Sequence, residues 1–125
     1  MFSVGSLTLA LALAIGASAS GYAHAQARDL NGVLTDDAGL TLYVFDNDMT
    51  VPGGSACVGA CLNMWTPLLA GNDPKPSGEY TLVKREDGKL QWAYKGRPLY
   101  RWYNDKKPGD QDGDGLRKVW HVARP

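Results

Sequence analysis

The sequence predicts a small, single, all-β domain built from two pseudo-symmetric repeats, with at most one short helical turn. One reason is that a ten-residue segment at 39–48 recurs at 96–105. The other is that short runs rich in aromatic and β-branched residues alternate along the chain with Gly, Pro, Asn and Asp, which is typical of strands joined by turns. We expect the repeats to span about residues 30–70 and 79–125.

The first 25 residues have the pattern of a cleaved secretory signal peptide. Residues 7–15 form a nine-residue, largely apolar run, which is too short to span a bilayer. Small residues follow, ending in Ala23-His24-Ala25, a sequence typical of signal-peptidase cleavage. We therefore expect a mature domain at 26–125, in the periplasm or secreted, with no transmembrane span after cleavage.

The composition of residues 26–125 limits the classes of partner. This segment holds all 13 Lys and Arg and all 13 Asp and Glu, so its formal net charge is zero. Such a mixture argues against a nucleic-acid partner, which would favour a basic bias. The first cysteine is Cys57, far from the expected cleavage point, so we expect no lipid anchor on an N-terminal cysteine.

The repeated segment defines the central strand of each half. Five of the ten positions in 39–48 and 96–105 are identical, and the pair Phe45 and Trp102 is aromatic in both. Downstream, each copy has a Pro-Gly step and then a Trp, at Trp65 and Trp120. Two copies favour a domain in which each half buries the apolar face of the other.

The remaining elements follow from turn signals. Residues 80–84 and 90–94 are expected to form a hairpin across Asp87-Gly88. Residues 71–78, with two prolines, are expected to form the loop between the repeats. The other expected elements are a strand at 30–34 pairing with 40–45 across 35–39, a helical turn within 60–65, and strands at 99–103 and 119–123.

Each repeat carries a Tyr-x-aromatic-x-x-Asp motif that permits two interpretations. Alternation along a strand places Tyr43 and Phe45 on one face, and likewise Tyr100 and Trp102. In one interpretation the rings form the core, while Asp48 and Asp105 lock a turn or accept a hydrogen bond from a Tyr hydroxyl. In the other, the rings form the floor of a ligand groove with a carboxylate at its edge.

These motifs resemble a family of bacterial secreted-repeat proteins, often lipoproteins, of unknown function and with a conserved Tyr-x-(Phe/Trp/Tyr)-x-x-Asp motif. Residues 43–48 and 100–105 both match that motif, and residues 57–67 and 108–125 are similar to the segments that follow it. The resemblance implies a repeat domain in the cell envelope. It implies no activity, and the chain departs from the lipoprotein members in lacking the anchoring cysteine.

The two cysteines, Cys57 and Cys61, are expected to form a structural disulfide. An exported protein meets an oxidising compartment, and a spacing of four suits a bridge across a tight turn. A redox couple or half of a metal site is the alternative, but catalytic pairs usually have two intervening residues.

Two further places are candidate metal sites. Asp110, Asp112 and Asp114 match the first half of a calcium loop, although His121 stands where an EF-hand would need its Glu. His121 is also the only histidine in 26–125, which makes a copper or zinc site poor in ligands. No cofactor is expected, with calcium at 110–115 as the one candidate.

Together these features predict an exported cell-envelope domain that binds an envelope protein or a small ligand without catalysis. The alternative is a periplasmic metal-binding or redox accessory protein that uses Cys57, Cys61 and His121 or the 110–115 loop. Asp48 and Asp105 also form a candidate glycosidase-like carboxylate pair, but their turn setting explains them without catalysis.

Overall fold

The structure, a computed structural model, describes residues 26–125. The predicted signal peptide at 1–25 lies outside the described residues. Within the described part no helix is long and apolar enough to cross a membrane.

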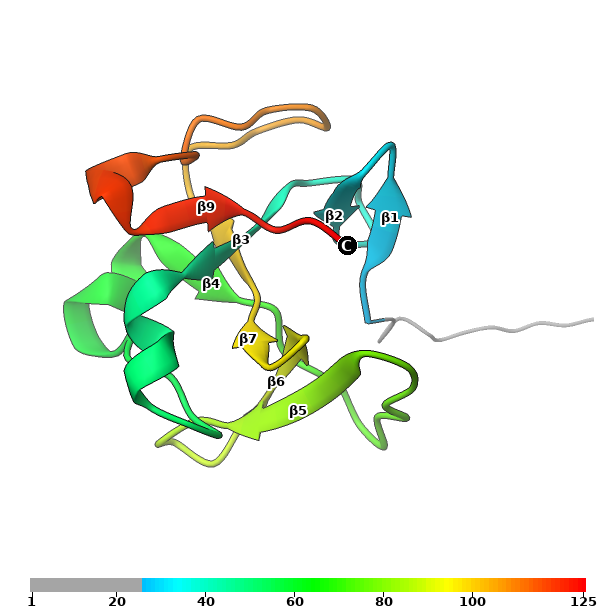
Figure 1. Ribbon diagram of the computed structural model, residues 1–125, viewed down its shortest axis with the longest axis vertical. Coiled ribbons are helices and arrows are strands. Elements are labelled where there is room, and N and C mark those ends of the chain that lie inside the picture. Colours follow the sequence, from blue (N-terminus) through cyan, green and yellow to red (C-terminus); the bar gives the residue numbers. More distant parts are fainter. Residues whose placement is uncertain (1–25) are drawn as a thin grey trace, which may run out of the picture.

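Nine short strands within residues 26–125 form three antiparallel sheets, which confirms the predicted all-β class (Figure 1). The central four-stranded sheet has the order β4-β8-β3-β9, and a three-stranded sheet, β5-β6-β7, and a two-stranded hairpin, β1-β2, accompany it. The strands are β1 (Arg28–Leu30), β2 (Val33–Thr35), β3 (Leu42–Phe45), β4 (Trp65–Pro67), β5 (Tyr80–Lys84), β6 (Leu90–Tyr94), β7 (Arg97–Pro98), β8 (Tyr100–Trp102) and β9 (Trp120–Val122).

The central sheet is two-fold symmetric in its strand order. Strands β3 and β8 carry the two motifs and lie side by side, with Tyr43 directly opposite Tyr100. Strand β4 of the first repeat pairs with β8 of the second, and β9 of the second repeat pairs with β3 of the first. Every strand pairing in this sheet therefore joins one repeat to the other.

Three short 3-10 helices connect these strands, where the sequence indicated one helical turn. They are η2 (Asp46–Thr50), η3 (Gly59–Asn63) and η4 (Leu116–Lys118), and only η3 lies where a turn was expected. η3 precedes Trp65 in the first repeat as η4 precedes Trp120 in the second. The three turns gather at one side of the molecule, on the left in Figure 1.

The N-terminal segment differs from the prediction. The expected strand at 30–34 is broken at Asn31 and Gly32, whose φ angles are 55° and 85°, and a hairpin between β1 and β2 forms around them. An Asn-Gly pair favours this because both positions of a type I′ turn need positive φ. The expected pairing of 30–34 with 40–45 is reduced to one bridge, between Thr35 and Thr41.

The second hairpin agrees with the prediction. β5 and β6 pair over their full lengths, from Tyr80 opposite Tyr94 to Lys84 opposite Leu90. A further turn at Lys95 and Gly96, both with positive φ, adds the short strand β7 beside β6 before β8 begins. This three-stranded sheet covers one face of the central sheet.

The core has two parts, one on each face of the central sheet. The aromatic part contains the motif rings Tyr43, Phe45, Tyr100 and Trp102 together with Trp65, Trp120, Cys57 and Val122. The aliphatic part contains Leu34, Leu42, Val44, Leu99 and Ala123 around Trp92 of β6. The alternation predicted for the motif strands is thus present, with Tyr43 and Phe45 facing away from Leu42 and Val44.

Candidate functional site

The two Tyr-x-aromatic-x-x-Asp motifs are joined by exchanged hydrogen bonds. The Tyr43 hydroxyl donates to Asp105 Oδ2 at 2.6 Å, and the Tyr100 hydroxyl donates to Asp48 Oδ2 at 2.7 Å. The tyrosine of each motif therefore bonds to the aspartate of the other. This arrangement follows from the antiparallel pairing of β3 with β8, which brings the end of each motif near the start of its counterpart.

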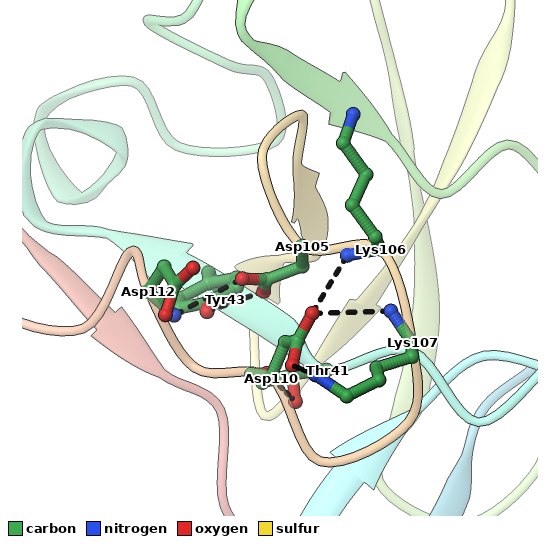
Figure 2. A network of polar contacts seen from close by, with 7 residues as sticks. All are labelled: Thr41, Tyr43, Asp105, Lys106, Lys107, Asp110 and Asp112. Carbon is green, nitrogen blue, oxygen red and sulfur yellow. Dashed lines mark hydrogen bonds and ion pairs between the residues drawn. The ribbon is translucent and has the colours of Figure 1, made fainter.

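Each motif aspartate also holds the loop that follows it. Asp48 Oδ1 accepts the Ala56 N–H at 2.7 Å, and Asp105 Oδ1 accepts the Asp112 N–H at 3.0 Å. Figure 2 shows the hydrogen bonds that join Asp105 to the Tyr43 hydroxyl and to the Asp112 N–H. Each carboxylate thus bridges the tyrosine of one repeat and a loop of the other.

Burial raises the pKa of Asp48, Tyr43 and Tyr100. Asp48 and Asp105 are only 4% and 6% exposed. Desolvation raises the pKa of Asp48, although the Ala56 N–H, the Tyr100 hydroxyl and the nearby Arg85 guanidinium each lower it in part. Desolvation likewise raises the pKa of Tyr43 and of Tyr100 far above the usual value for tyrosine, so both hydroxyls stay protonated as donors.

Four aromatic rings form a continuous stack over the central sheet. Trp65 and Trp120 lie in parallel planes with ring centroids 3.6 Å apart, although β4 and β9 are the outer strands of the sheet. Phe45 stacks on Trp120 at 4.1 Å, and Trp102 packs on Trp65 at 4.4 Å. The order Phe45-Trp120-Trp65-Trp102, called the four-ring stack below, alternates between the repeats.

The tyrosines support the stack from the side of the sheet. Tyr43 meets Trp65 edge to face at 5.3 Å, and Tyr100 meets Trp120 in the same way at 5.2 Å. Edge-to-face contacts of this kind are favoured by the charge distribution of aromatic rings. Gly113 fits against the same rings, since a Cβ at this position would lie 2.8 Å from Trp65 Cη2.

A pocket of about 530 Å³ opens beside the four-ring stack, between η3 and η4. All four rings of the stack line it, together with Asn47 and with residues of the two turns, namely Ala60, Cys61, Met64, Leu116, Arg117 and Val119. Its volume lies in the range typical of small-molecule sites. Because both repeats supply the rings and the turns, the pocket exists only when they are assembled.

The predicted motif residues divide between core and pocket. Tyr43, Tyr100, Asp48 and Asp105 are buried and bonded to one another. Phe45 and Trp102 line the pocket as well as belonging to the core. The aromatic wall and the carboxylates are thus separate, and no motif carboxylate is among the residues that line this pocket.

The calcium loop predicted at 110–115 does not bring its carboxylates together. Asp110 accepts hydrogen bonds from the backbone N–H groups of Lys106 and Lys107, as Figure 2 shows, and pairs with the Lys107 ammonium at 3.0 Å. Asp114 accepts the Val122 N–H instead. Within residues 26–125 no group of three or more His, Cys, Asp or Glu is placed to hold a metal ion.

The other candidate ligands have structural partners. Cys57 and Cys61 form the predicted disulfide, with Cα atoms 5.3 Å apart. His121 Nε2 lies 2.9 Å from Asp46 Oδ2, and Arg97 lies 3.0 Å from the other oxygen of Asp46. The hydrogen bond with His121, and secondarily that with Arg97, lowers the pKa of Asp46.

The sequence predicted a groove floored by the motif rings, of which Phe45 and Trp102 line this pocket, but it did not place Trp65 and Trp120 there. Trp65 and Trp120 were recognised as matching markers downstream of each motif, but not as partners of each other. The two tryptophans occupy equivalent positions, Trp65 after η3 and Trp120 after η4. This equivalence could have indicated their contact, since equivalent residues that lie near a two-fold axis meet each other.

The comparisons with known proteins agree with the repeat architecture. A family model described as a secreted repeat of unknown function matches residues 26–69 and again residues 81–124. These two matches together cover more than half of the chain. No curated protein and no solved structure matches it significantly.

Proposed function

This chain belongs to the family of secreted repeats of unknown function, and from this premise we propose that it is a non-catalytic binding module of the bacterial cell envelope. Its binding site is the pocket beside the four-ring stack, and its ligand is a small molecule with apolar surface. The predicted signal peptide supports a periplasmic or secreted location.

The observation that carries this proposal is the composition of the pocket wall. Phe45, Trp65, Trp102 and Trp120 line it, so a ligand would replace water against extensive aromatic surface. Met64 is 44% exposed at the rim, where a flexible side chain can adapt to a bound molecule.

The environment of the motif carboxylates supports binding rather than catalysis. Asp48 and Asp105 each accept a tyrosine hydroxyl and a backbone N–H, which explains both residues as structural. The metal-binding and redox alternative has weaker support, because Asp110, Asp114 and His121 are engaged with other partners and the two cysteines are joined.

Binding of the neutral fluorescent probe N-phenyl-1-naphthylamine tests the proposal. We expect its emission to rise on binding to the protein, and we expect energy transfer from the pocket tryptophans to the probe. Ala60→Phe should abolish the signal, because Ala60 lies exposed on η3 and lines the pocket, so a larger side chain fills the site without disturbing the core.

Ala38→Phe is the matched control. Ala38 is also exposed but lies in the turn after β2, where it lines a different hollow. This variant should bind the probe as the unchanged protein does. Probe binding that survives Ala60→Phe would show that the pocket is not the site.

A further inference from the structure

The two rims of the pocket are equivalent in fold but opposite in chemistry. Arg117 and Lys118 stand three and two residues before Trp120 on η4. At the same distances before Trp65, on η3, the first repeat has Leu62 and Asn63. Among the residues that line the pocket, those from η3 and its end are uncharged, whereas η4 contributes the cation Arg117, with Lys118 next to it in the chain.

Arg117 is the one charged residue among those that line the pocket. Neither Arg117 nor Lys118 forms an ion pair within residues 26–125. Asp114, three residues before Arg117, accepts the Val122 N–H and forms no ion pair in the described part of the chain, and Asp46 is paired with Arg97 and His121. The positive charge at this rim thus has no counter-ion in the described part of the chain.

The backbone holds these cations in an uncommon conformation. Arg117 and Lys118 have φ angles of 51° and 62°, in the left-handed region that non-glycine residues rarely adopt. The Gly115 N–H donates to Trp120 O and the Lys118 N–H to Gly115 O, which fixes the turn against β9. Strained positions of this kind persist where surrounding structure imposes them, and they concentrate at binding sites.

We propose that the ligand is an organic anion with a flat apolar body, the body lying against the four-ring stack and the acidic group facing Arg117 and Lys118. This inference rests on the proposed function and adds the charge and the orientation of the ligand. The apolar body accounts for the aromatic wall and the uncharged rim. The acidic group accounts for the unpaired cations, whose attraction is strengthened by the adjoining low-dielectric wall.

Two probes of matched shape test this inference. 8-Anilinonaphthalene-1-sulfonate is N-phenyl-1-naphthylamine with one added sulfonate, so the pair differs chiefly in the anionic group. The Kd of each probe is measured for the unchanged protein and for Arg117→Gln. For each probe, the Kd for Arg117→Gln is divided by the Kd for the unchanged protein. Comparing these two ratios cancels the intrinsic difference between the probes, as in a double-mutant cycle.

We expect Arg117→Gln to raise the Kd of the sulfonate probe about fivefold, which corresponds to the upper range for a solvent-exposed ion pair. The neutral probe should keep its affinity within about twofold, since it makes no ionic contact. Rising salt should weaken the sulfonate probe alone, because counter-ions screen exposed charges. Lys118→Gln should have a smaller effect in the same direction, as Lys118 is not among the lining residues.

Lys95→Gln is the matched control for charge and backbone. Lys95 is an exposed cation with a φ angle of 50°, but it lies at the turn between β6 and β7 and lines a different hollow. This variant should leave both probes unaffected. An effect equal to that of Arg117→Gln would mean that overall charge, not the rim, attracts the sulfonate, and would overturn the inference.

The outcomes separate this inference from the proposed function. If Ala60→Phe abolishes the binding of both probes but Arg117→Gln changes the Kd of neither, the pocket is a binding site and the inference of an anionic ligand is wrong. If both probes bind unchanged after Ala60→Phe, the pocket itself is wrong and the inference falls with it. If Arg117→Gln weakens the binding of the sulfonate probe alone, the result supports both the proposed function and the anionic ligand.

Discussion

At the scale of single residues, the two exchanged Tyr–Asp pairs have different neighbours. The Tyr43 hydroxyl donates to Asp105 and also accepts the Gly113 N–H at 3.2 Å. The Tyr100 hydroxyl donates to Asp48 and lies within hydrogen-bond distance of the Ser55 hydroxyl. A backbone N–H can only donate, whereas a serine hydroxyl can donate or accept. The second pair therefore has an alternative proton arrangement that the first lacks.

This difference predicts unequal effects of replacing each aspartate by asparagine. In Asp105→Asn the new amide N–H₂ would face a tyrosine oxygen that already accepts a hydrogen bond, and the tyrosine proton would lose its acceptor. We expect a loss of about 2 kcal/mol in the free energy of unfolding, as for a buried unsatisfied donor. In Asp48→Asn, Tyr100 can donate to Ser55 instead, so the loss should be under about 1 kcal/mol.

Urea unfolding of both variants, followed by tryptophan fluorescence, measures the two losses. Tyr43→Phe provides the control, because it removes the hydroxyl proton. In this background a further Asp105→Asn change should lower the free energy of unfolding very little. Equal losses for the two asparagine variants would contradict the role assigned to Ser55.

The sequence allowed part of this chemistry to be predicted. A hydrogen bond from a Tyr hydroxyl to a motif Asp was one of two interpretations, since both residue types are fixed in the motif. The exchange between repeats could not be predicted, because a hydroxyl's partner depends on which strands lie side by side. Likewise Asp110, Asp112 and Asp114 have the spacing of calcium ligands, yet the backbone N–H groups around them determine where their carboxylates point.

At the scale of elements, Asp46 connects three strands. It follows β3, and its carboxylate contacts Arg97 of β7 and His121 of β9. These contacts lower its pKa below the ordinary value of 3.8. A carboxyl whose pKa is lower in the folded state stabilises the fold above its unfolded pKa, and this contribution is lost as pH falls through the folded pKa.

Asp46→Asn should therefore destabilise the protein near neutral pH but not in acid. The side chains of Asp46, Arg97 and His121 are 44%, 33% and 42% exposed, so solvent screens the pairs and the loss should be under about 1 kcal/mol. We expect the difference from the unchanged protein to shrink in acid, as pH falls through the lowered folded-state pKa of Asp46 and the carboxyl becomes protonated. Thermal unfolding across this pH range measures it.

Asp48→Asn gives the opposite trend and serves as the control. Burial raises the pKa of Asp48, so its favourable contribution is complete below the unfolded pKa and is lost as pH rises through the folded pKa. The stability of Asp48→Asn relative to the unchanged protein should therefore improve with rising pH. A constant difference for Asp46→Asn across the whole range would contradict the ion-pair account.

The elements that the sequence predicted well are those with local turn signals. The hairpin of β5 and β6 follows from Asp87-Gly88 between two alternating runs. The same kind of signal at Asn31-Gly32 was masked by apolar residues on both sides, which favoured one continuous strand. The short helices η2 and η4 carry no helical periodicity, because 3-10 turns of this length are set by the strands they join.

At the scale of the whole molecule, the two repeats are interlocked rather than adjacent. β3 and β4 of the first repeat do not pair with each other, and neither do β8 and β9 of the second. The four-ring stack, the exchanged hydrogen bonds and the pocket all alternate between repeats. The duplication was visible in the sequence, but interlocking was not, because long-range strand pairing leaves no local pattern.

Interlocking predicts that the repeats fold only together. Cleavage between Pro74 and Lys75, in the exposed loop between the repeats, would give fragments 26–74 and 75–125. Each fragment alone would lack every pairing of the central sheet and one member of the Trp65–Trp120 stack. We expect neither to show the near-ultraviolet circular dichroism of stacked tryptophans, and an equimolar mixture to recover it.

The hairpin of β5 and β6 lies wholly within the second fragment, so far-ultraviolet signal from that fragment alone is compatible with this prediction. A near-ultraviolet signal from either fragment alone as strong as that of the intact protein would contradict the prediction, since one repeat cannot build the Trp65–Trp120 stack.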